Sequence, residues 1–215
     1  MNELIFKLSE SEFIKVMPEC NIAFEKVDYC CSEITAYFID KNKQLKIGQQ
    51  TAGEFFESFI KKIKKVINND LQLHESLTYN LGFMQNQYYQ DKSGFSMVST
   101  IHRSKPYWVG FNYSVWSTYG DANPLVSTWL HNDLNGNIIF EATKDYPWHF
   151  IELEGEPDSL EFITYDEFMK DYKPLIHRII PRDVAITWLE QAMKAYRGLF
   201  KDEKDFIRAC NEMNE

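Results

Sequence analysis

The sequence predicts an α+β fold, in which an antiparallel sheet packs with one amphipathic helix and a helical C-terminal segment. Three observations favour it: helical apolar spacing near residues 52–68, two-residue apolar alternation from 107 onward, and helix-start signals after 165. Strands come before helices without βαβ alternation, which disfavours a parallel sheet. At 215 residues, without repeats or a linker, the chain is expected to form a single domain, 1–215.

The first fifty residues indicate short strands. Glu33 to Ile39 is the clearest strand, and residues 44–47 are a return strand after the polar turn at 41–43. Thr51 and Glu54 then have the spacing of a capping box, which predicts that a helix begins there. The apolar residues that follow at helical spacing are Phe55, Phe56, Phe59, Ile60, Ile63, Val66 and Ile67.

The middle of the chain predicts the antiparallel sheet. From Tyr107 to Ser117 the odd positions are apolar, which predicts a long strand with one core face. Residues 127–133 and 137–143 flank Asn135-Gly136, a strong signal for a hairpin with a type I′ turn.

The last third is expected to be helical. Residues 165–172 indicate one helix, a segment from Pro174 to Ile180 a second, and the residues after Pro181 a third. Proline is tolerated in the first turn of a helix, so the two prolines are expected to separate three short helices.

The formal net charge of −9 comes from the C-terminal half. Residues 1–106 carry 13 basic and 13 acidic side chains, whereas residues 107–215 carry 10 and 19. The stretch from Glu141 to Asp171 holds ten acids and two bases, a net charge of −8. This charge attracts a basic protein partner and repels nucleic acid and anionic membranes. The expected contact residues are Asp145, Glu152, Glu154, Glu156, Asp158 and Glu161.

Motifs for common cofactors and metals are missing or incomplete. The sequence has neither a phosphate-binding nor a dinucleotide-binding glycine motif, and it has no nucleophile elbow. His74-Glu75 begins like a zinc motif, but Thr78 stands where the second histidine is required. A calcium loop aligned on Gly136 has Ala142 where a bidentate glutamate is needed. We therefore expect no cofactor and no metal.

Two alternatives to a binding protein stay open. Folding could bring Glu141, His149 and Glu152 together as a small hydrolase site, although His149 and Glu152 point to opposite faces of an extended segment. Trp108 and Trp116 could instead form a carbohydrate or small-ligand site on the mixed face of the strand from 107. The missing motifs favour a protein that is not an enzyme.

Other features indicate a cytoplasmic protein. There is no apolar run of about 18 residues and no signal-peptide pattern at the start. The four cysteines include no C-x-x-C pair and are expected to be reduced thiols.

The C-terminal eighty residues carry a resemblance. Residues 135–141 with Tyr146-Pro147, and then the segments 165–168, 172–176, 180–181 and 188–189, resemble small acidic bacterial proteins of unknown function. Some of those proteins are regarded as immunity proteins of polymorphic toxin systems. The resemblance implies a protein that binds and neutralises a cognate toxin, and it transfers no catalytic residue.

Overall fold

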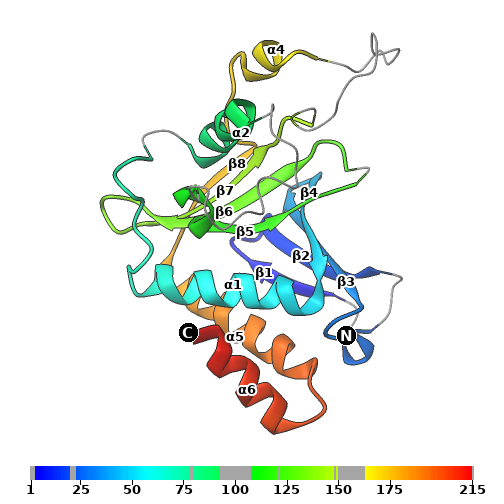
Figure 1. The fold of residues 1–215 in the computed structure, drawn as a ribbon. Helices are drawn as coiled ribbons and strands as arrows, with labels where there is room; N and C mark the ends of the chain where they lie inside the picture. Colours follow the sequence, from blue (N-terminus) through cyan, green and yellow to red (C-terminus); the bar gives the residue numbers. More distant parts are fainter. Residues whose placement is uncertain are drawn as a thin grey trace.

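Two four-stranded antiparallel sheets and a set of helices make up the fold in a computed structural model (Figure 1). The structure describes residues 3–19, 23–77, 80–92, 108–120, 122–147, 149 and 163–214. The first sheet contains β1 (Leu4–Lys7), β2 (Glu12–Pro18), β3 (Glu33–Asp40) and β4 (Lys43–Thr51) in sequence order. The second contains β5 (Ser114–Ser117), β6 (Val126–Asn132), β7 (Ile138–Lys144) and β8 (Ile176–Ile180). The predicted α+β class is confirmed.

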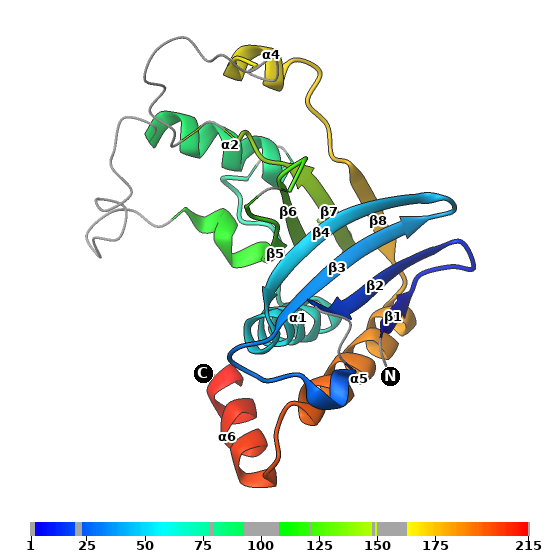
Figure 2. The ribbon, with the colours of Figure 1, turned by 90° about the vertical axis from the view of Figure 1, so that its right-hand side faces the viewer.

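Helix α1 (Ala52–Ile67) starts and ends within one residue of the predicted segment. Its buried face is the predicted apolar stripe, which packs against both sheets. Trp116 of β5 stacks on Phe55 with ring centroids 4.5 Å apart, and its Nε1 donates to the carbonyl of Phe55 at 3.1 Å. Helix α5 (Arg182–Gly198) packs beside α1 (Figure 2). Its Trp188 contacts the rings of Phe6 and Phe59.

Three further α-helices complete the described fold. They are α2 (Leu81–Lys92), α4 (Tyr165–Met169) and α6 (Glu203–Asn214). Helix α2 lies against β7, where Gly82 meets Thr143: a Cβ on this glycine would lie 2.2 Å from Thr143 Oγ1. Helices α2 and α4 lie at the end of the molecule opposite α6 (Figure 1).

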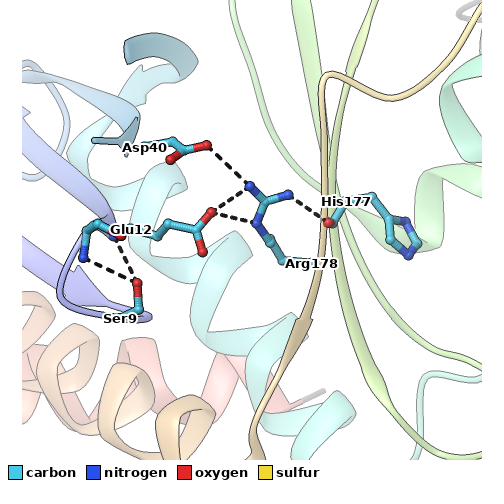
Figure 3. A network of polar contacts seen from close by, with 6 residues as sticks. Ser9, Glu12, Asp40, His177 and Arg178 are labelled. Carbon is cyan, nitrogen blue, oxygen red and sulfur yellow. Dashed lines mark hydrogen bonds and ion pairs between the residues drawn. The ribbon is translucent and has the colours of Figure 1, made fainter. Parts of the chain in front are cut away.

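An arginine at the edge of the second sheet joins the two sheets. Arg178 of β8 reaches Glu12 of β2 through Nε at 2.8 Å and through Nη2 at 2.5 Å, and its Nη2 lies 3.5 Å from Asp40 of β3. Figure 3 shows the guanidinium between the two sheets, with the imidazole of His177 pointing to the other side of β8. Neighbouring residues of a strand alternate between its faces, so Arg178 and His177 have different environments.

The hairpin between β6 and β7 is confirmed, but its turn is not type I′. Gly136 has a φ of 79°, whereas Asn135 is not among the described residues with positive φ. Gly136 N–H donates to the carbonyl of Asp133, and Asp133 N–H donates to the carbonyl of Asn137, both at 3.0 Å. These bonds enclose a three-residue loop with the glycine in its left-handed position.

The long strand predicted from Tyr107 to Ser117 is wrong over most of its length. Tyr107 lies outside the described residues, Val109–Tyr113 form the 3₁₀-helix η3, and only the segment from Ser114 is a strand. The indole of Trp108 folds back over Gly110, where a Cβ would lie 2.1 Å from it, and meets the ring of Phe111 at 5.1 Å. This local packing favours a tight turn over an extended chain.

The middle helix of the predicted C-terminal three is also wrong. Residues 176–180 form β8, which pairs with β7 so that Glu141 faces His177. Ile176 and Ile180 are buried, whereas His177 and Ile179 are exposed. Apolar residues four positions apart fit a strand as well as a helix, and the free edge of β7 favours the strand.

Candidate functional site

The acidic stretch is described at its two ends. Of the six expected contact residues, Glu152, Glu154, Glu156, Asp158 and Glu161 lie outside the described residues. The remaining one, Asp145, directly follows β7. The described residues show how the two ends are held.

Asp145 is turned into the fold rather than toward a partner. Its carboxylate accepts hydrogen bonds from Ser127 Oγ at 2.7 Å and from Gln85 Nε2 at 3.0 Å. Burial raises the pKa of Asp145 to about 7, and the bond from Ser127 opposes this shift. The prediction that Asp145 is a surface contact does not fit this environment, because its oxygens already bind β6 and α2.

Asn86 of α2 fixes the chain just after Asp145. Its Oδ1 accepts from the backbone N–H of Tyr146 at 2.7 Å and lies 3.2 Å from Nε2 of His149. A carboxamide oxygen only accepts, so Nε2 of this histidine carries the proton. The Nδ2 amide group of Asn86 lies within donating distance of the carbonyls of Gly82 and Lys144 and of the hydroxyl of Tyr172, at 2.8, 2.9 and 3.2 Å. Asn86 is fully buried, and its amide ties α2 to the start of the acidic stretch.

His149 is an enclosed residue. It is 5% exposed, and its ring packs against Tyr146 and Tyr165 with centroids 5.0 and 5.8 Å apart. Burial lowers the pKa of His149 to about 4, so the ring is neutral near neutral pH. This environment suits a structural anchor better than a surface base.

Tyr146 joins two segments within the acidic stretch that are far apart in sequence. Its hydroxyl donates to the carbonyl of Ile163 at 3.0 Å, and its ring packs against Phe168 at 5.3 Å. A capping box of Thr164 and Glu167 starts α4 directly after this contact. The chain is therefore anchored at one place in the fold both at Tyr146 and at Ile163, directly before α4.

A second group of titratable side chains lies on the outer face of the second sheet. His177 Nδ1 lies 2.7 Å from Glu141 Oε1, and the side chain of His177 is 56% exposed. A carboxylate oxygen accepts, so Nδ1 carries the proton and Nε2 is the nitrogen available as a base. His131 of β6 is buried on the same face. Burial lowers the pKa of His131, and the charge of Glu141 opposes this shift only in part. Glu141 Oε2 and His131 Nδ1 have no hydrogen-bond partner among the described residues.

The structure does not bring together the residues of the hydrolase alternative that it describes, Glu141 and His149. Glu141 pairs with His177, while His149 packs at the base of the acidic stretch, and Glu152 lies outside the described residues. The sequence did not suggest His177, because the segment that contains it resembled a helix. Had the segment been read as a strand, the register of β7 and β8 would have placed this pair.

The two tryptophans of the ligand-binding alternative do not share a surface. Trp116 is fully buried and packs on α1. Trp108 packs on the other side of the second sheet, against Tyr88 at 5.8 Å and against Trp129 at 6.0 Å. Trp116 is therefore a core residue, and stacking of one ligand on both rings is not supported.

No family model, curated protein or solved structure matches the chain. Over the residues that the structure describes, no helix is both long and apolar enough to cross a membrane. In the same residues, no group of three or more His, Cys, Asp or Glu side chains is arranged to hold a metal ion.

Proposed function

We propose that the protein is a non-enzymatic binding protein that engages a basic protein partner through its acidic stretch. The observation that carries the proposal is a net charge of −8 between Glu141 and Asp171, in a stretch within which Tyr146 and Ile163 are joined by a hydrogen bond. This link reduces the conformational entropy that the segment between them loses when it binds. An immunity protein that neutralises a basic toxin in the cytoplasm is the form of this function that the resemblance supports.

The described acids divide into anchors and exposed charges. Glu141 and Asp145 are bonded within the fold, whereas Asp166, Glu167 and Asp171 are exposed near α4. We therefore assign partner contact to Glu152, Glu154, Glu156, Asp158 and Glu161 and leave Asp145 as an anchor. A dense group of like charges mainly accelerates encounter with a basic partner.

The test compares two triple variants with the same change in net charge. The first variant replaces Glu152, Glu154 and Glu156 with lysine. The control variant replaces Asp70, Glu75 and Glu190 with lysine, because these three residues are exposed and lie outside the acidic stretch. Association with the protein encoded by the adjacent gene is measured by surface plasmon resonance at low and physiological salt. We expect the first variant to associate at least about tenfold more slowly, the control much less so, and the parent to slow as salt rises. Equal association rates for parent and first variant at both salt concentrations would contradict the proposal.

A second candidate is a small hydrolase centred on Glu141 and His177. The buried carboxylate orients the imidazole through Nδ1 and leaves Nε2 for proton transfer, as in a base that activates a nucleophile. Turnover of a model ester by the parent and by His177→Ala tests this candidate. Equal turnover would remove it without affecting the binding proposal.

A further inference from the structure

The C-terminal half of α1 carries four lysines and, over residues 58–67, no acid. These lysines, which we call the basic face, are Lys61, Lys62, Lys64 and Lys65. Lys61 and Lys65 are exposed, and the other two are partly buried. Among the residues that the structure describes, none of the four forms an ion pair. The positive charge of the basic face is therefore unmatched within the described fold.

The lysines of the basic face repel one another. Lys61 and Lys65 are four positions apart and Lys62 and Lys65 are three apart, which are the spacings at which like charges on a helix are neighbours. The Nζ of Lys62 donates to the carbonyl of Asn112 in η3. Burial, together with the charges of Lys65 and Lys61, lowers the pKa of Lys62 to about 8. A partner that supplies carboxylates relieves this repulsion.

The chain carries the matching charge in its own acidic stretch. Within that stretch, residues 150–162 hold five acids and no base. Acids of β2, β3 and α6 are already paired with arginines, so they do not offer free charge of this kind. The four lysines of the basic face and the five acids of this segment are therefore complementary in sign and similar in number.

Helix α1 and the anchored base of the acidic stretch lie on opposite faces of the second sheet. Ser127 of β6 bonds to Gln85 of α2 and to Asp145, where the acidic stretch is anchored. Asn132 of the same strand donates from Nδ2 to the carbonyl of Val66 in α1 at 2.9 Å. Odd and even positions of a strand point to opposite faces, and Figure 1 shows strands of the second sheet between α1 and α4. This arrangement favours contact between two copies over contact within one.

We propose that the basic face of α1 binds the acidic stretch of a second copy of the chain. Two copies can make this contact reciprocally, which closes a symmetric dimer. The net charge of −9 on each copy opposes association, but salt screens it beyond about 8 Å at physiological ionic strength, whereas paired side chains are in contact. The contact uses the acidic stretch of the proposed function and requires no basic partner, so either proposal can fail alone.

The test is a charge swap followed by sedimentation equilibrium. One variant combines Lys61→Glu and Lys65→Glu, and the other replaces Glu152, Glu154 and Glu156 with lysine. We expect the parent to dimerise with a dissociation constant of about 0.1 mM that increases with salt, and each variant alone to dimerise at least about tenfold more weakly. An equimolar mixture should dimerise like the parent, because both contacts then join opposite charges while both chains keep a negative net charge.

The matched control combines Lys26→Glu and Lys43→Glu, because these lysines are exposed elsewhere and the net charge changes equally. Its mixture with the lysine-substituted variant should dimerise more weakly than the swapped mixture. A parent that stays monomeric, dimerisation that strengthens with salt, or a swapped mixture that does not restore the dimer would overturn the proposal. The variant of the basic face should still bind the basic partner no more slowly than the parent, which separates this proposal from the proposed function.

Discussion

Replacing Asn86 with alanine should destabilise the protein strongly, because this one amide connects α2 to the start of the acidic stretch. The variant removes the acceptor of the buried Tyr146 N–H and of His149 Nε2. It also removes the donor to the Lys144 carbonyl. A buried polar group that loses its partner costs about 1 to 3 kcal/mol, so the two lost acceptor contacts cost about 2 to 6 kcal/mol.

Urea and thermal unfolding measure this loss. For a chain of this length each kcal/mol lowers Tm by about 2 to 4 °C, so we expect a decrease of about 4 to 24 °C. Gln87→Ala is the matched control, because Gln87 is exposed on the same helix. A loss below about 1 kcal/mol, or equal losses for the two variants, would refute the reasoning, because surface substitutions alone reach about 0.5 kcal/mol.

Three further substitutions test the packing and electrostatics. Arg178→Met should lower the free energy of unfolding by about 1 to 2 kcal/mol. A double-mutant cycle with Glu12→Gln should give a coupling energy of about 0.5 to 1.5 kcal/mol between the two side chains. A coupling energy near zero would show that the link between the sheets does not stabilise the fold. Gly82→Ala should cost about 1 to 3 kcal/mol because its Cβ would lie 2.2 Å from Thr143 Oγ1 and 2.3 Å from Thr143 Cβ, and an unchanged free energy of unfolding in urea would contradict this close contact. Burial raises the pKa of Asp145 from 3.8 to about 7, so the folded state holds a proton that the unfolded state has released between these values. Stability from this group is therefore lost as pH rises toward 7, and Asp145→Asn should gain on the order of 2 kcal/mol relative to the parent between about pH 5 and about pH 8. Parallel urea-derived stability curves for parent and variant would contradict the shift.

Local patterns determined the elements that have one dominant period. The apolar stripe of α1 fits a helix and cannot be placed on one face of a strand, so its limits followed from the sequence. The pairs β3 with β4 and β6 with β7 are joined by short polar turns, so their partners are also neighbours in sequence. Pro181 likewise marked the start of α5.

Ambiguous periods were resolved by tertiary contacts. The isoleucines of β8 fit two periods, and pairing with β7 selected the strand. The alternation around Val109 resembled a strand, but the indole of Trp108 packs over Gly110 and Trp129 and thereby favours the 3₁₀ turn. The strand that pairs with β8 and the ring that packs on Trp108 are both distant in sequence, so a short sequence segment cannot predict them.

The sequence alone determined the charge of the acidic stretch, because charge follows directly from composition. Which acids are anchors was decided by contacts between distant residues. Asn86 and Tyr146 are 60 positions apart, and Glu141 and His177 are 36 apart. Glu57 shows both effects: its place on α1 followed from the predicted helix, whereas Tyr29 and Tyr196, whose hydroxyls bond its carboxylate, come from distant segments. Hydrogen bonds between distant residues depend on how the elements pack, and that packing exists only after the chain has folded.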